Sequence, residues 1–203
     1  YQIARCFRDE DLRNDRQPEF TQIDAELSFA DREQVMSLME QMIVKVFHEA
    51  GGVQLPSPFP RMTYAEAVGR YGSDKPDLRF DMPLHDVTAF AAASEFKVFK
   101  EAATKGGIVK ALIVKGGAAT PRSRIDALGE MAKGFGAKGL AWLKITPEGQ
   151  LESVIAKFLD AKAFTAALPE AKPGDLVLFG ADKVAIVHDV LGRIRLLLGE
   201  ELK

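Results

Sequence analysis

Cysteine and histidine are scarce in this sequence of 203 residues. The single cysteine, Cys6, cannot form an internal disulfide, and its place in an alternating segment predicts a small buried side chain rather than a nucleophile. The three histidines, His48, His85 and His188, lack the spacing of metal ligands. The sequence therefore predicts neither a disulfide framework nor a metal site.

Long apolar runs and a net charge are also missing. No stretch reaches the roughly 18 apolar residues of a membrane span, and the first residues lack the apolar segment of a signal peptide. Lysine and arginine total 27 against 29 acids, so nucleic-acid binding would require a local cluster. We expect a cytoplasmic protein without membrane contact. Because the chain does not begin with methionine, we interpret it as a piece of a longer protein.

Lysine is absent from the first 44 residues, where every basic group is arginine. Residues 1–10 alternate as a strand does, residues 11–18 are polar and resemble a loop, and the alternation resumes at Phe20. This pattern predicts a hairpin with a charged face and an apolar face. The predicted polar face carries Ala4, Cys6, Arg8, Glu10, Gln22, Asp24, Glu26 and Ser28, and the second strand turns Ile23, Ala25, Leu27 and Phe29 toward a core.

The remainder predicts an α+β fold in two parts. Asp31 and Gln34 predict a capping box for a helix over 31–50, whose apolar stripe is expected to pack in a core. A proline-rich connector over 55–61 precedes a short helix that Thr63 caps. Downstream we predict helices over 87–93, 120–134 and 153–168 and from 183 onward, and strands over 95–102, 107–117, 139–145 and 174–181. The polar stretch before residue 84 divides the chain into domains 1–83 and 84–203.

The charged hairpin face has two interpretations on residue chemistry alone. A solvated sheet face is one, since charged side chains are costly to bury without partners. A nucleotide or anion site is the other, because arginine suits bidentate contacts with phosphate or carboxylate and Phe20 offers a stacking surface for a flat base. The residues themselves leave both interpretations open.

A family resemblance favours the second interpretation. The segment FRDEDLRNDRQPEFTQIDAELSF, residues 7–29, resembles motif 2 of class II aminoacyl-tRNA synthetases, specifically the bacterial aspartyl type. YAEAVGRYGSDKPDLRF resembles the segment that follows it, and GAKGLAWLKI resembles the GAD domain inserted in these enzymes. The resemblance covers essentially the whole chain. It implies an antiparallel-sheet fragment of the catalytic core in residues 1–83 and an inserted α+β GAD domain in 84–203.

The resemblance also implies roles for individual residues. Such enzymes join aspartate to ATP as an adenylate and then transfer the aspartyl group to the 3′ end of tRNA. Arg8 would be catalytic and contact both the ATP α-phosphate and the aspartate carboxylate. The other implied sites are Asp9, Glu10, Gln17 and Phe20 for ATP, Gln22 and Asp24 for aspartate, and Arg13 and Arg16 for the tRNA acceptor end. Arg13 and Arg16 also have the simpler interpretation of solvated loop charges.

Several parts of the family pattern have no counterpart here. These are the dimer-forming motif 1, the loop that selects the aspartate side chain, motif 3 with its second arginine, and the acidic ligands of Mg²⁺. We therefore expect a homodimeric parent enzyme and an isolated fragment that is inactive. Two alternatives remain open: a noncatalytic GAD-type docking module, and an asparagine synthetase-like class II enzyme that binds no tRNA. The sequence does not distinguish a parent specific for aspartate tRNA from one that also charges asparagine tRNA.

Overall fold

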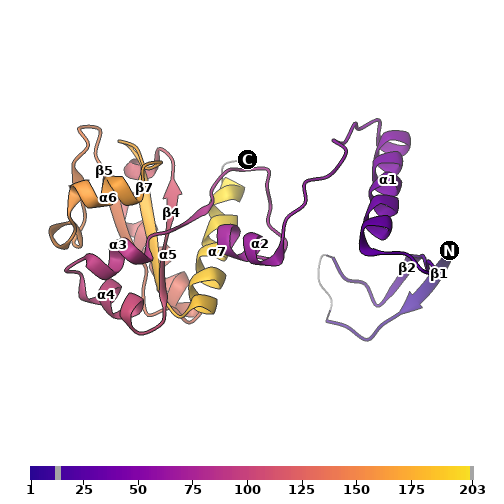
Figure 1. The fold of residues 1–203 in the computed structure, drawn as a ribbon, viewed down its shortest axis with the longest axis horizontal. Helices are drawn as coiled ribbons and strands as arrows, with labels where there is room; N and C mark the ends of the chain where they lie inside the picture. The colour runs from indigo at the N-terminus through magenta and orange to yellow at the C-terminus, as the bar shows by residue number, and fades with distance from the viewer. Residues whose placement is uncertain (12–14, 202–203) are drawn as a thin grey trace. The chain divides into compact units, whose positions relative to one another are not determined.

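The computed structural model describes residues 1–11 and 15–201, which form two compact units, Tyr1–Arg61 and Met62–Lys203 (Figure 1). The fold class is α+β, as predicted. The compact units divide after Arg61, within the connector, whereas the sequence places the domain boundary at 83/84. That boundary remains a prediction about the parent's domains. No helix in the described part of the chain is long and apolar enough to cross a membrane.

The first unit holds the hairpin and one long helix. Strands β1 (Gln2–Phe7) and β2 (Glu19–Asp24) pair antiparallel, and helix α1 (Arg32–Gly51) follows. The predicted capping box is confirmed: Gln34 N–H donates to Asp31 Oδ1 at 2.8 Å, and Asp31 N–H donates to Gln34 Oε1 at 2.9 Å. Gly52 adopts a left-handed conformation and ends the helix.

The predicted core between the hairpin and α1 does not form within this chain. Ile23, Leu27 and Phe29, which were expected to anchor the hairpin, are exposed. Five apolar residues along α1 are exposed as well: Val35, Leu38, Ile43, Val46 and Phe47. The expectation failed because the hairpin and a single helix present these side chains without apolar surface to bury them. A broad apolar face therefore remains uncovered on this unit.

A buried carboxylate holds the connector against α1. Glu40 is 7% exposed, accepts a hydrogen bond from the Phe59 N–H and forms an ion pair with Arg61 at 2.8 Å. A charge can be buried at this depth because both of its oxygens have donors. The chain from α1 to Arg61 is thereby fixed to the first unit.

The second unit is built on a five-stranded sheet in which every pair is antiparallel. Its order is β3 (Leu84–Asp86), β4 (Ile108–Val114), β7 (Leu176–Asp182), β5 (Ala141–Ile145) and β6 (Leu151–Glu152). Residues alternate between two buried layers along β4 and β7, so both faces of the sheet are covered. Because both faces are buried, the sequences of β4 and β7 are nearly continuous apolar runs.

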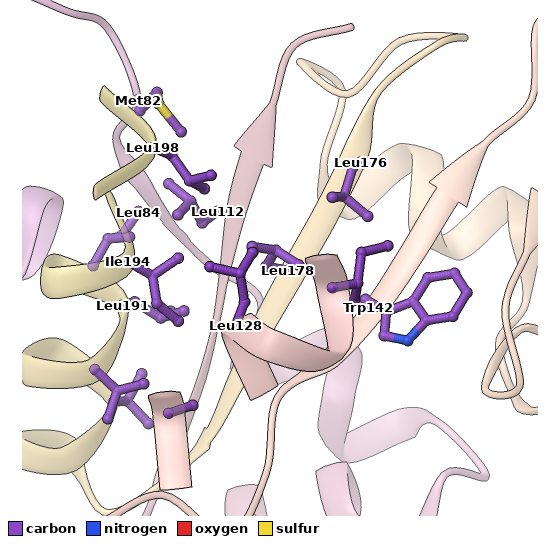
Figure 2. Close-up of a cluster of buried hydrophobic side chains, with 14 residues drawn as sticks. Met82, Leu84, Leu112, Leu128, Trp142, Leu176, Leu178, Leu191, Ile194 and Leu198 are labelled. Carbon is purple, nitrogen blue, oxygen red and sulfur yellow. The ribbon is translucent and has the colours of Figure 1, made fainter. Parts of the chain in front are cut away.

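Helices form the two outer layers. On one face, α5 (Arg122–Gly134) and α7 (Val184–Glu201) pack over a cluster that includes Leu112, Leu178 and Trp142 (Figure 2). On the other, α3 (Thr88–Ala93), α4 (Lys97–Thr104) and α6 (Ala161–Ala167) pack over Phe99, Leu143 and Phe179. Two short 3₁₀ helices, Gly117–Ala119 and Ala156–Phe158, complete the unit.

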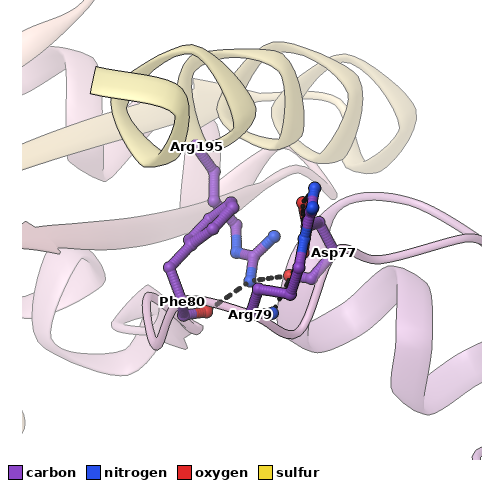
Figure 3. A network of polar contacts seen from close by, with 4 residues as sticks. All are labelled: Asp77, Arg79, Phe80 and Arg195. Carbon is purple, nitrogen blue, oxygen red and sulfur yellow. Dashed lines mark hydrogen bonds and ion pairs between the residues drawn. The ribbon is translucent and has the colours of Figure 1, made fainter. Parts of the chain in front are cut away.

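Residues 62–83 belong to the second unit because they are fastened to α7. Helix α2 (Tyr64–Tyr71), capped by Thr63 as predicted, ends at Gly72, whose backbone lies against Gly192. Arg195 of α7 is 1% exposed and donates a hydrogen bond to the Met82 carbonyl at 2.9 Å. It also donates to the carbonyls of Asp77 and Phe80, at 2.8 and 3.2 Å (Figure 3). Burial lowers the pKa of its guanidinium, yet arginine remains charged in proteins.

Two predicted elements were wrong. Residues 95–102 were expected to be a strand but contain α4, because Phe96, Phe99 and Ala102 follow a helical period that turns Phe99 into the core and leaves Val98 exposed. The single helix predicted over 153–168 is instead a 3₁₀ turn followed by α6. Asp160 interrupts it, since its carboxylate accepts the Ala163 N–H at 2.7 Å and caps a new helix.

Candidate functional site

The hairpin register determines which side chains share a face. Directly opposite residues of an antiparallel pair point to the same side. Cys6 lies opposite Phe20, Ala4 opposite Gln22, and Gln2 opposite Asp24. One face therefore carries the Gln22 amide and the Asp24 carboxylate, as predicted, and the Phe20 ring lies on the same face. The opposite face carries Ile3, Arg5, Phe7, Glu19, Thr21 and Ile23.

Arg8 extends this face beyond the end of β1. Its backbone N–H donates to the Pro18 carbonyl at 2.8 Å, which continues the strand pairing by one step. Its guanidinium carbon lies 5.0 Å from the centroid of the Phe20 ring, within the range of a cation–π contact. This contact places the Arg8 side chain on the same face as Phe20 and Asp24, as predicted.

A carboxylate links two arginines at the loop end of the hairpin. Glu10 forms ion pairs of 3.8 Å with Arg8 and with Arg16. Both arginines are about half exposed, so the pairs are worth little in free energy. Their effect is to gather two cations around one acid and to leave guanidinium donors available for a second anion.

The other end of the face is negatively charged. Asp24 accepts a hydrogen bond from Gln2 Nε2 at 3.0 Å, and the Cys6 thiol lies 3.8 Å from the Gln22 amide oxygen. Arg8 lies level with Pro18 and Asp24 level with Gln2, six residues apart along β1, or about 20 Å at the rise of a strand. Arg8 and Asp24 were expected to converge across the paired strands, and this expectation was wrong. Even the Arg8 guanidinium, which leans back over Phe20 opposite Cys6, stays four residues along β1 from the level of Asp24.

The other residues with a predicted role lie beside the loop, beyond the strands or outside the described part of the chain. Asp9 and Gln17 are exposed beside the loop. Arg13 lies outside the described residues, as does the centre of the loop that was expected to be mobile without tRNA. Glu26 was predicted to extend the polar face, but β2 ends at Asp24 and Glu26 is an exposed residue beyond the strand. Gln2, which holds Asp24, was missed because only the cross-strand register reveals it.

Within residues 1–11 and 15–201, no group of three or more His, Cys, Asp or Glu side chains comes together in a way that could hold a metal ion. The described residues therefore do not fit a Mg²⁺ site. The expectation that such ligands belong to other parts of the parent remains a prediction.

Similarity to known proteins agrees with the geometry of the hairpin. The family model of class II tRNA synthetases (D, K and N) matches residues 1–179. Proteins named Aspartate–tRNA(Asp/Asn) ligase from Bacillus cereus and Bacillus thuringiensis are 56% identical over 207 aligned positions, and one from Bacillus cytotoxicus is 55% identical over 206.

The alignments differ in how much of each protein they cover. Each alignment covers all of this chain but only 35% of the relative, so the chain spans about a third of the length of these proteins. The family match, by contrast, covers most of the chain and includes the whole hairpin. The chain belongs to the class II tRNA synthetases of the D, K and N group.

Proposed function

We propose that this chain is part of an aspartate–tRNA ligase, which forms aspartyl-adenylate from ATP and aspartate and then transfers the aspartyl group to the 3′ end of tRNA. The observation that carries the proposal is the single hairpin face with Arg8 and Phe20 toward one end and Asp24 at the other. The names of the relatives support the choice of aspartate. Because those names include both tRNAs, the proposal extends to aspartate and asparagine tRNA.

The charges that this face carries match the charges of the reactants. In adenylation a carboxylate attacks the α-phosphorus of ATP, so two anions must approach each other. Arg8 would contact both, reduce their repulsion and align them for in-line attack. Phe20 would stack on the adenine ring. Asp24 would bind the ammonium group of aspartate, and the Gln2 amide would hold its carboxylate in place.

The loop end supplies the remaining contacts of the proposal. Glu10 steadies Arg8 through its ion pair and would face the adenine, with Asp9 and Gln17 beside the ATP. Arg16 would contact the acceptor end of tRNA, as would Arg13 by resemblance alone. Arginine suits this role because its planar guanidinium binds phosphate or base edges in a fixed geometry.

The rest of the parent supplies what this chain does not show. The exposed apolar side chains of the hairpin and α1 would be covered by the remainder of the catalytic core, and motif 1 would make the parent a homodimer. Residues 84–203 would be the inserted GAD domain. The described residues hold no group of metal ligands, and the ligands of Mg²⁺ would belong to other parts of the parent. The parent would act in the cytoplasm, where its tRNA substrates are charged.

Aspartate-dependent ATP–pyrophosphate exchange by the full-length parent tests the proposal. Arg8→Ala should lower the exchange rate by about 100-fold to 1000-fold, the usual effect of losing one pre-organised contact to a developing anion. Arg5→Ala is the matched control, because Arg5 lies on the opposite face and pairs with Glu19 at 3.2 Å. Its exchange rate should stay near that of the unchanged parent. Equal rates for both variants would remove Arg8 from the reaction.

A further inference from the structure

Two groups of the polar hairpin face contact the Arg8 guanidinium. Its central carbon lies 5.0 Å from the centroid of the Phe20 ring, and its Nη1 lies 3.8 Å from Glu10 Oε1. Phe20 and Glu10 are also the two side chains that the proposed function gives to the adenine of ATP. In this structure one cation therefore contacts both of the groups assigned to the base.

The contact between Arg8 and Phe20 competes with the stacking of a base. Stacked aromatic rings keep their centroids about 4.5–7 Å apart, and the guanidinium carbon at 5.0 Å lies within this range. A guanidinium is planar and covers an aromatic face much as a base does. A base can therefore stack on that face of Phe20 only after the Arg8 side chain has moved.

The contacts of Arg8 are weak enough to be exchanged. Its side chain is 59% exposed, and cation–π contacts and ion pairs contribute little at exposed positions. Glu10 also pairs with Arg16 at 3.8 Å, so it keeps a cationic partner when Arg8 leaves. Arg8 can therefore change partners at little cost, and its contact with the ring biases binding without blocking it.

We infer that Arg8 is a switch that couples recognition of the base to contact with the phosphates. Adenine replaces the guanidinium at Phe20 and Glu10, and the displaced guanidinium moves to the α-phosphate. Adenosine alone displaces Arg8 without giving it a new partner, and a phosphate chain alone draws Arg8 from the ring without covering the ring again. Each half of ATP therefore binds more weakly than it would to an uncovered site. The inference rests on the proposed function for the identity of the ligand, and it adds the change of partners by Arg8.

Equilibrium dialysis of the full-length parent tests the switch, with adenosine and inorganic tripolyphosphate as separate probes. Arg8→Ala should bind adenosine about 2-fold to 5-fold more tightly, because no cation covers the ring, and it should bind tripolyphosphate more weakly. Phe20→Leu should bind tripolyphosphate about 2-fold to 5-fold more tightly, because Arg8 no longer has to leave a ring, and it should bind adenosine more weakly. A misfolded variant would lose both probes, so opposite changes in the two affinities exclude misfolding.

Arg5→Ala and Phe7→Leu are the matched controls, because both residues lie on the opposite face of the hairpin. Each should leave the affinity for both probes unchanged. The switch is refuted if Arg8→Ala binds adenosine no more tightly than the unchanged parent, or if either site variant loses both probes. Slower ATP–pyrophosphate exchange by Arg8→Ala with an unchanged adenosine affinity would refute the switch and leave the proposed function standing. An unchanged exchange rate would instead refute the proposed function, so the two failures are distinguishable.

Discussion

Replacing Arg195 by methionine tests how the second unit holds residues 62–83 against α7. The guanidinium donates to three backbone carbonyls and lies 4.7 and 4.4 Å from the ring centroids of Tyr71 and Phe80. Methionine fills similar space, but it donates no hydrogen bond. The substitution therefore leaves the carbonyls without their donor while most of the packing is retained.

The expected magnitude follows from these contacts. Three hydrogen bonds from a charged donor contribute about 1.5 kcal/mol each at the low end of their range, and the two ring contacts add about 1 kcal/mol each. Relief from burying a cation offsets several kcal/mol of this sum. We expect Arg195→Met to lower the free energy of unfolding by about 3 kcal/mol. With a urea m value of about 2 kcal/mol/M, the midpoint falls by about 1.5 M.

Urea unfolding followed by tryptophan fluorescence is the assay. Trp142 is the single tryptophan of the sequence, so the signal reports the second unit alone. Arg193→Met is the matched control on the same helix. Arg193 is half exposed, pairs with Asp189 at 2.9 Å and lies 4.5 Å from the Phe135 ring centroid. Its loss should lower the free energy of unfolding by only about 1 kcal/mol. An Arg195→Met midpoint as close to the unchanged chain as that of the control would refute the reasoning.

Further predictions concern backbone packing, pH and activity. Gly72→Ala should destabilise the second unit by at least about 3 kcal/mol, because a Cβ there collides with the backbone of α7 at a φ of +71°. Gly106→Ala has a φ of +80° but open space, so urea unfolding should show a loss of only about 1 kcal/mol; equal losses would contradict the packing argument. Burial lowers the pKa of His188 below its ordinary value of 6.5, so the unfolded state binds more protons and stability should fall as the pH drops from 7.5 to 5.5. His188→Gln should weaken this dependence without removing it, because burial also lowers the pKa of His85. An unchanged slope in urea titrations would exclude His188 as a source. The 203-residue chain alone should catalyse no aspartate-dependent ATP–pyrophosphate exchange, and clear exchange would show that its residues suffice.

Local signals in the sequence predicted local structure well. The capping residues Asp31 and Thr63 mark helix starts because each accepts hydrogen bonds within three residues of itself. Contacts between distant segments were not predictable in this way. In the sequence Arg195 is one of several charged residues of α7, and nothing nearby marks it as buried. Its carbonyl partners lie 113 to 118 residues earlier in the chain. The association of residues 62–83 with α7 therefore could not be inferred from sequence pattern.

The hairpin shows the same division between local and distant information. Strand alternation was enough to place Gln22 and Asp24 on one face, since the period of two is fixed by the pleat. It did not show where β2 ends, so Glu26 was assigned to that face incorrectly. The hydrogen bond from Gln2 to Asp24 was not predicted, because it depends on the register of the two strands across the intervening loop.

The position of β7 in its sheet constrains the order in which the second unit can be completed during synthesis. β7 is the last strand in the sequence, yet it pairs with β4 on one side and β5 on the other. As the ribosome releases the chain from its N-terminus, β4 and β5 emerge without their common neighbour, and their unpaired edges await residues 176–182. A nascent chain stalled before β7 should therefore be an aggregation-prone intermediate, whereas release of this one strand joins the two halves of the sheet.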